Sequence, residues 1–286
     1  MAEAGRVHWA QYAARAALRA GGFRDTTVAT RQGRIHVYQA RGRGPSGDLV
    51  IIHGLGSAAS AFARTMHALR PHAQRILAPE LPGHGFSEPL ADPPSVDGML
   101  EALTEALDEL LDRPAVVFGN SLGGAAALRF ALRRPARVKG LVLGSPGGAA
   151  MNHDELQALL GAFRVDSSRA GRALAERLFH TPPWFVPLLG GFIRRNFAQA
   201  PLRGLVNAFS PADLLTPDEL GGLAMPVLLL WGRGEKLLPP RAFDWFRAHL
   251  PPHAVIEEPA GWGHCPQLER PLELAERLAR FMHQVA

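Results

Sequence analysis

The chain has 286 residues, of which 47% are hydrophobic, so it is long enough to bury both faces of a β-sheet. This fits one large α/β domain with an insertion, or two smaller domains. The formal net charge is +5, but the positive charge is nearly all arginine and is scattered along the chain. Nucleic-acid-binding proteins concentrate their basic residues, so this pattern argues against such a partner. The only cysteine, Cys265, excludes a disulfide framework and a cysteine-based metal site.

The apolar segments do not have the length or continuity of a membrane anchor. The longest charge-free apolar run, 181–193, is interrupted by three prolines, whereas a membrane span needs about 20 apolar residues. The first 20 residues mix arginines with alanines and lack the apolar core of a secretory signal. We therefore expect a soluble, cytoplasmic protein without stable membrane insertion, either a monomer or a homodimer.

Helical and strand-like patterns alternate over the first half of the chain. The spacing predicts an amphipathic helix over 7–20. Short apolar runs of the kind that form strands follow it. The predicted strands are 26–30, 34–40, 49–52, 75–78, 115–118 and 138–143, and the predicted helices between them are 58–69, 96–111 and 122–133. Strands that alternate with helices predict a parallel sheet with right-handed crossovers.

This rhythm stops after residue 148 and resumes after residue 212. Residues 151–212 contain helical patterns and two proline clusters but no convincing strand. Strand patterns return at 226–230 and near 254–257, with helices near 240–249 and over 271–284. We therefore predict one α/β core formed by 1–148 and 213–286, with 149–212 inserted as a helical cap or lid.

The stretch Gly119-Asn120-Ser121-Leu122-Gly123 fits the G-x-S-x-G pattern of a nucleophile elbow. The pattern alone is common, but here it lies between an apolar strand and a helix, as the motif requires. A tight turn at this place pushes the serine into a strained conformation, and the glycines leave room for neighbouring backbone. The sequence thus indicates that Ser121 is a catalytic nucleophile.

A glycine-rich turn after the strand 49–52 is a candidate oxyanion site. Such a turn can present backbone N–H groups to the negative charge that develops on a carbonyl oxygen. The expected donors are the N–H of Leu122, directly after the nucleophile, and the N–H of Leu55 in His53-Gly54-Leu55-Gly56.

A serine nucleophile needs a base, and the base needs an orienting acid. His264 follows the last predicted strand and precedes the last helix, which places it at the same sheet edge as the elbow. Its chief rival, His84, precedes Ser121 in the chain, against the expected order of serine, acid and histidine. In the loop after the strand 226–230, Glu235 is the only carboxylate, and we expect it to orient His264.

These landmarks together resemble the α/β-hydrolase superfamily over nearly the whole chain. The resemblance implies an α/β fold with a mostly parallel, eight-stranded sheet, helices on both faces and a helical cap after the sixth strand. It also implies catalysis without a metal or organic cofactor. The residues that carry it are His53-Gly54, Pro82-Gly83-His84-Gly85, Gly119 to Gly124, Trp231-Gly232, and Gly263-His264 with Pro266.

Within the superfamily, residues 119–148 are most similar to the carbon–carbon bond hydrolases of aromatic ring-cleavage pathways. Asn120 and Ser145-Pro146-Gly147-Gly148 carry this likeness, whereas Glu235 and Cys265 depart from it, since aspartate and tryptophan are usual there. The glycine run at 53–56 is also shorter than theirs. Epoxide hydrolases and haloalkane dehalogenases are excluded, because they use aspartate where this chain has Ser121.

The predicted cap is rich in apolar and aromatic residues, which are typical of ligand pockets and equally of simple packing. We expect Trp184, Phe185 and Asn120 to contact substrate, and Arg194 to hold a carboxylate unless it faces solvent. The predicted activity is cleavage of a small, apolar carboxylic ester. The alternatives are carbon–carbon hydrolysis of a dienoate, thioester hydrolysis, acyl transfer, and non-catalytic binding.

Overall fold

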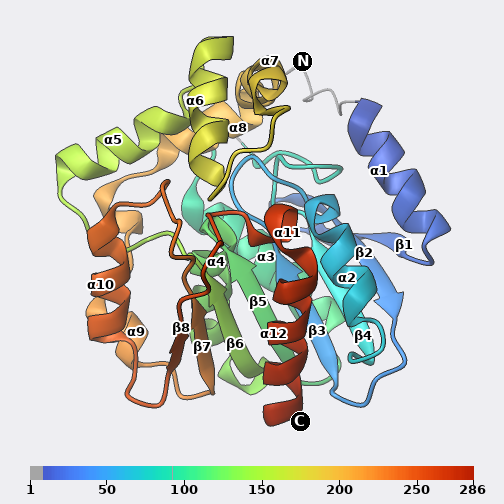
Figure 1. Ribbon diagram of the computed structural model, residues 1–286. Coiled ribbons are helices and arrows are strands. Elements are labelled where there is room, and N and C mark those ends of the chain that lie inside the picture. The colour runs from blue at the N-terminus through green and yellow to red at the C-terminus, as the bar shows by residue number, and fades with distance from the viewer. Residues whose placement is uncertain (1–8, 92) are drawn as a thin grey trace.

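The computed structural model of the protein describes residues 9–91 and 93–286 and contains one eight-stranded sheet with the strand order β1-β2-β4-β3-β5-β6-β7-β8 (Figure 1). The strands β3 to β8 pair in parallel, and β2 is antiparallel to both β1 and β4. The mostly parallel sheet is confirmed. The strands are β1 (Arg24–Thr30), β2 (Gly33–Arg41), β3 (Asp48–Ile52), β4 (Arg75–Pro79), β5 (Ala115–Asn120), β6 (Val138–Gly144), β7 (Val227–Leu230) and β8 (Val255–Glu257).

The helices lie close to the predicted ranges, except that the start of the helix expected over 7–20 falls outside the described residues. Helix α4 has the predicted bounds, and the predicted helix 58–69 is a 3₁₀ turn, Ala59–Phe62, followed by α2. The helices are α1 (Trp9–Ala20), α2 (Ala63–Leu69), α3 (Val96–Leu110), α4 (Leu122–Arg133), α5 (His153–Phe163), α6 (Ser168–Leu178), α7 (Val186–Phe197), α8 (Ala200–Ala208), α9 (Pro217–Gly221), α10 (Pro240–His249), α11 (Pro266–Glu269) and α12 (Pro271–Gln284).

Both faces of the sheet are buried, which explains why its central strands are continuously apolar. In β3, Val50 and Ile52 pack with α3 and α4 on one face, while Leu49 and Ile51 pack with α2 and α12 on the other. Figure 1 shows α2 and α12 in front of the sheet and α3 behind it.

The chain changes direction within the sheet beside β3. From β3 the chain crosses to β4 on one side, and from β4 it returns to β5 on the other side of β3. In open α/β sheets, ligands bind at the carboxyl ends of the strands at such a switch point. The turn after β3 carries Leu55, and the turn after β5 carries Ser121.

Of the five α-helices between β6 and β7, helices α5 to α8 gather above this edge of the sheet (Figure 1). We refer to residues 153–208 as the α5–α8 segment. It lies within the predicted cap, 149–212. None of the helices in the described part of the chain is long and apolar enough to cross a membrane.

Candidate active site

Ser121 lies on the sharp turn between β5 and α4. Its backbone has φ 57° and ψ −122°, a conformation that non-glycine residues rarely adopt and that costs free energy. Backbone hydrogen bonds hold this turn: the N–H of Ser121 donates to Gly144 O at 3.0 Å, and its carbonyl accepts from the N–H groups of Gly124, Ala125 and Gly147 at 2.8, 3.2 and 2.9 Å. The surrounding backbone thus maintains the strained conformation that the motif predicts.

The two glycines of the motif are required by close backbone packing. A Cβ atom on Gly119 would lie 2.0 Å from Gly123 O, and one on Gly123 would lie 2.3 Å from Ile52 O. Real Cβ atoms do not approach backbone so closely, so any other residue would displace the elbow from β3 or unwind the start of α4.

Glu235 and His264 form a buried hydrogen-bonded pair on the loops after β7 and β8. Glu235 Oε2 lies 2.7 Å from His264 Nδ1, and both side chains are at most 5% exposed. Glu235 Oε1 accepts the N–H groups of Leu237 and Leu238 at 2.7 and 3.1 Å. Burial raises the pKa of Glu235, but the contacts with His264 and these two N–H groups outweigh it, so the net pKa is lowered. The carboxylate is therefore ionised at neutral pH.

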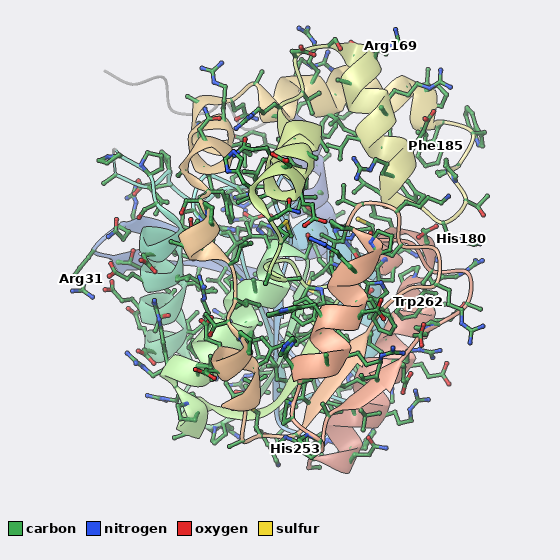
Figure 2. The ribbon with its side chains drawn as sticks, turned by 90° about the vertical axis from the view of Figure 1, so that its left-hand side faces the viewer. Arg31, Arg169, His180, Phe185, His253 and Trp262 are labelled. Carbon is green, nitrogen blue, oxygen red and sulfur yellow. The ribbon has the colours of Figure 1, made fainter. Side chains whose placement is uncertain are left out.

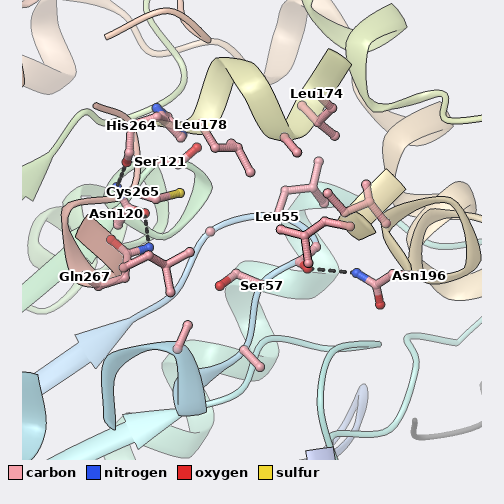
Figure 3. Close-up of a pocket in the computed structure, with 18 of the residues that line it drawn as sticks. Leu55, Ser57, Asn120, Ser121, Leu174, Leu178, Asn196, His264, Cys265 and Gln267 are labelled. Carbon is pink, nitrogen blue, oxygen red and sulfur yellow. Dashed lines mark hydrogen bonds between the residues drawn. The ribbon is translucent and has the colours of Figure 1, made fainter. Parts of the chain in front are cut away.

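Ser121 and His264 line the same cavity, which has a volume of about 320 Å³ (Figure 3). Helices α6 and α7 supply much of its apolar wall, and α1, the turn after β3 and α11 supply the rest. The structure therefore brings together Ser121, His264 and Glu235, which lie far apart in the sequence.

Two buried histidines hold the turn after β3. The N–H of Leu81 donates to His53 Nε2 at 3.0 Å, and His53 Nδ1 lies 2.8 Å from Gly54 O. The N–H of Gly56 donates to His84 Nε2 at 2.9 Å, and His84 Nδ1 lies 3.0 Å from Pro82 O. Each ring thus accepts one backbone proton and donates another. Both nitrogens of His84 are occupied, which argues against a role for it as the base.

Burial keeps both of these histidines neutral. It lowers the pKa of His53 to about 3, with a further contribution from the nearby His84, and lowers the pKa of His84 to about 4. A protonated ring would lose the acceptor nitrogen that fixes the turn.

The turn held in this way lies directly against the elbow. A Cβ on Gly54 would be 3.1 Å from the Cβ of Ser121 and 3.7 Å from its Oγ. Leu55 N–H follows on this turn, and Leu122 N–H is in the first turn of α4. Among the described residues neither N–H has a protein acceptor. The N–H groups of Leu55 and Leu122 therefore lie beside Ser121 and are available to bind a substrate oxygen.

Asn120 lies in the wall of the cavity, but its side chain is committed to the protein. Its Nδ2 donates to Gly144 O and His264 O at 3.0 and 3.1 Å, and its Oδ1 accepts from Gln267 Nε2 at 3.2 Å. Asn120 thereby ties the loop of His264 to β5 (Figure 3), and its contact with substrate stays a prediction. Gln267, which the sequence did not single out, completes this connection.

The predicted substrate contacts of Trp184 and Phe185, which directly precede α7, and of Arg194 on α7 are corrected by their exposure. Trp184 is 85% exposed and Phe185 is 40% exposed, and Figure 2 shows Phe185 at the outer surface. Arg194 is also exposed, and none of the three lines a cavity at Ser121. The face of α7 that does line the cavity repeats at helical spacing, as 189, 192/193 and 196/197. It was missed because the apolar pattern around 184–193 marks more than one face.

Hydrogen bonds join α6 to the loops of Glu235 and His264. Arg177 at the end of α6 donates to the carbonyls of Lys236 and Leu237. The N–H of Cys265, next to His264, donates to Leu178 O at 3.1 Å. A displacement of α6 would therefore strain both loops.

Cys265 lines the cavity beside His264 but is a poor second nucleophile. Burial raises the pKa of its thiol far above the ordinary value, so it stays protonated and unreactive. Over residues 9–91 and 93–286, no group of three or more His, Cys, Asp or Glu side chains is arranged to hold a metal ion.

The sheet order, the strained serine and the buried histidine–glutamate pair define a protein of the α/β-hydrolase class. Residues 49–277 match the model of the alpha/beta hydrolase family, and the chain belongs to this family. Membership of this family supports hydrolase activity, and so do relatives that are named esterases.

Two curated relatives are each 30% identical to the chain. One is a pimeloyl-[acyl-carrier protein] methyl ester esterase of Neisseria meningitidis, aligned over 82% of this chain and 93% of its own length. The other is a 2-hydroxy-6-oxononadienedioate/2-hydroxy-6-oxononatrienedioate hydrolase of a Pseudomonas species, aligned over 76% and 81%. A bacterial membrane phospholipase A of known structure is similar in fold, with a TM-score of 0.82 and 24% identity over 97% of this chain and 91% of its own.

Proposed function

We propose that this protein is a serine hydrolase that cleaves carboxylic esters with apolar acyl and alcohol groups through an acyl-enzyme on Ser121. One observation carries the proposal. Ser121, held in its strained turn, and His264 line one apolar cavity, and His264 Nδ1 is bonded to the buried carboxylate of Glu235. This arrangement supports proton transfer from serine to histidine.

In the first step, Ser121 Oγ attacks the ester carbonyl carbon while His264 Nε2 takes the serine proton. The electron pair of the carbonyl bond moves to its oxygen, which the N–H groups of Leu55 and Leu122 stabilise. Glu235 holds the ring with its Nδ1–H toward the carboxylate and stabilises the imidazolium that forms.

In the second step, the tetrahedral intermediate breaks its bond to the alcohol oxygen, and His264 returns the proton to that oxygen. A water molecule, deprotonated by His264, then attacks the acyl-enzyme. The carboxylic acid leaves and Ser121 recovers its proton. The chemistry uses only these side chains and water.

The cavity favours an apolar ester over a charged substrate. Its wall includes Leu174, Leu178, Phe192 and Phe197, and among residues 9–91 and 93–286 no arginine or lysine lines it. A curated relative that acts on a methyl ester supports the same chemistry. We propose carbon–carbon hydrolysis second, because another curated relative is a dienedioate hydrolase. Arg194, the residue expected to hold a dienoate carboxylate, is exposed and does not line the cavity.

The test is a panel of p-nitrophenyl esters assayed beside a ring-cleavage dienoate. For Ser121→Ala we expect kcat/KM for the esters to fall by roughly 10³- to 10⁶-fold, with an unchanged melting temperature. A fluorophosphonate probe should label Ser121 with one equivalent, measured by intact mass, and should not label the variant. Near-normal ester turnover by Ser121→Ala would refute the proposal. Dienoate turnover far above that of every ester would establish the second function instead.

A further inference from the structure

Ser121 lies where two cavities meet. The first, described above, has a volume of about 320 Å³, and the second has about 80 Å³ and lies between α3, α4 and α5. Among the described residues, Leu55 and Ser121 alone line both cavities. An ester bound at Ser121 therefore has two separate places for its two halves.

The chemical groups of the site are divided unequally between the cavities. His264 faces the larger cavity and is absent from the wall of the smaller one. Leu122, at the start of α4, lines the smaller cavity and not the larger one. His264, the proton donor, and Leu122, one of the expected oxyanion donors, thus lie on different sides of Ser121.

The path of the proton determines which half of the ester each cavity holds. The leaving alcohol oxygen must lie beside His264 to receive its proton. The acyl chain extends from the carbonyl carbon away from that oxygen. We propose that the larger cavity holds the alcohol group, that the smaller cavity holds the acyl chain, and that the side chain of Leu55 is the partition between them. This proposal rests on the proposed esterase function.

Leu55 is placed to separate the two groups by its packing. Its side chain contacts the sheet core, the cluster that contains Leu174 and Phe197, and the cluster that contains Leu156 and Leu160. No backbone hydrogen bond depends on this side chain. Leu55 therefore has two roles: its N–H faces the oxyanion, and its side chain keeps the cavities apart.

The unequal volumes point to a class of substrate. The smaller cavity is lined mostly by apolar side chains, and the charged residues Arg129 and Asp213 also lie in its wall. The guanidinium of Arg129 is already bonded to Glu219 and to Leu214 O, at 3.0 and 3.2 Å. A long acyl chain would have to displace these contacts. The structure therefore favours esters of a short, apolar acid with a bulkier, apolar alcohol.

A pair of isomeric esters tests this assignment directly. Octyl butanoate and butyl octanoate have the same composition and the same number of carbon atoms, but they exchange the long chain between alcohol and acid. We expect kcat/KM for octyl butanoate to exceed that for butyl octanoate by about 10-fold or more, since each methylene that a pocket excludes costs about this factor. Both esters are assayed on one enzyme sample, so the fraction of active protein cancels from the ratio.

Two matched substitutions enlarge one cavity at a time. Leu160, 5% exposed on α5, lines the smaller cavity, and Leu174, 3% exposed on α6, lines the larger one. Leu160→Ala should raise the relative turnover of longer acyl chains about 10-fold and leave the ranking of alcohols as it is. Leu174→Ala should change the ranking of alcohols and leave the ranking of acyl chains. Leu55→Ala, which removes the partition, should flatten both rankings.

The outcomes separate this inference from the function on which it rests. If neither isomeric ester nor any p-nitrophenyl ester is hydrolysed, the esterase proposal itself fails. If esters are hydrolysed but butyl octanoate is preferred, or if Leu160→Ala and Leu174→Ala exchange their effects, the cavity assignment is overturned. An unchanged ranking in Leu55→Ala, with measurable turnover, would overturn its role as the partition.

Discussion

At the scale of single residues, Glu235 shows how a longer acid fits this site. The resemblance to the ring-cleavage hydrolases leads us to expect aspartate at this position, and the glutamate side chain is one methylene longer. The extra length is accommodated because Oε1 is anchored by Leu237 and Leu238 N–H, which leaves Oε2 2.7 Å from His264 Nδ1. The carboxylate is therefore held at both oxygens.

Substitution of Glu235 by glutamine should disable the site without removing its shape. The amide can still accept from Leu237 and Leu238, but it then turns its NH₂ group toward His264 Nδ1. This favours the tautomer that has its proton on Nε2, where the ring can no longer accept the serine proton. We expect kcat/KM to fall by about 10³- to 10⁴-fold. Ester hydrolysis by Glu235→Gln, measured across pH 5–9, tests this.

The matched control is Glu276→Gln, which removes one carboxylate from the exposed side of α12 and should leave ester turnover unchanged. A Glu235→Gln variant that retains more than a tenth of wild-type kcat/KM would show that Glu235 does not orient the base.

At the scale of helices, the wall of the larger cavity depends on how closely α6 and α7 approach. A Cβ on Gly171 would lie 2.3 Å from Gly190 O, and one on Gly190 would lie 2.2 Å from Ser168 O. The backbones of the two helices are therefore in contact. Because this contact sets the rotation of α7, it decides which residues of α7 face Ser121.

Gly190→Ala should push α7 away from α6. We expect the free energy of unfolding to decrease by about 1–3 kcal/mol, the typical cost of inserting a methyl group where there is no space. Urea denaturation measures this change.

Gly191→Ala is the matched control on the same helix, since its Cβ would find its nearest neighbours at 3.7 and 3.8 Å. Alanine is the better helix former, so this variant should be unchanged or more stable by up to about 1 kcal/mol. Equal stability of the two variants would show that α6 and α7 do not depend on this contact.

At the scale of the whole molecule, the buried neutral histidines couple folding to pH. His53 and His84 connect the turn after β3 to the segment after β4, and so hold two loops at the active edge of the sheet. Their pKa values in the folded state, about 3 and about 4, lie below the 6.5 of an unfolded histidine. Between these limits the unfolded chain binds protons that the folded protein does not.

Stability should therefore be fully present above pH 6.5 and decrease as the pH falls toward 4. Each histidine contributes a slope of roughly 1.4 kcal/mol per pH unit in this window. Urea denaturation at several pH values measures the slope, and His84→Gln should roughly halve it. The lowered pKa of Glu235 contributes stability that is present above its ordinary value of 4.5 and is lost as the pH falls below it. A wild-type stability that does not change between pH 6.5 and 4.5 would contradict the buried neutral state of both rings.

The amino-acid sequence by itself determined the order of strands and helices and the identity of the central residues. Apolar runs and helical periodicity reflect local backbone geometry, so the predicted ranges agree closely with those observed. Ser121 was identifiable because a strained turn between strand and helix needs glycines at fixed spacing, and His264 and Glu235 because they follow neighbouring strands. In the structure, Ser121 and His264 line one cavity and His264 is bonded to Glu235, while their catalytic roles stay a prediction.

Only the tertiary structure decided which side chains face the substrate cavities. Trp184, Phe185 and Arg194 looked suitable by composition, but all three are exposed. The rotation of α7 against α6 turns Arg194 outward and turns Phe192 and Phe197 toward the cavity. Asn120 is similarly committed to backbone groups of β6 and of the His264 loop, which are far from it in sequence. The rotation of a helix is set by contacts between distant segments, such as Gly171 with Gly190, and local sequence patterns do not contain that information.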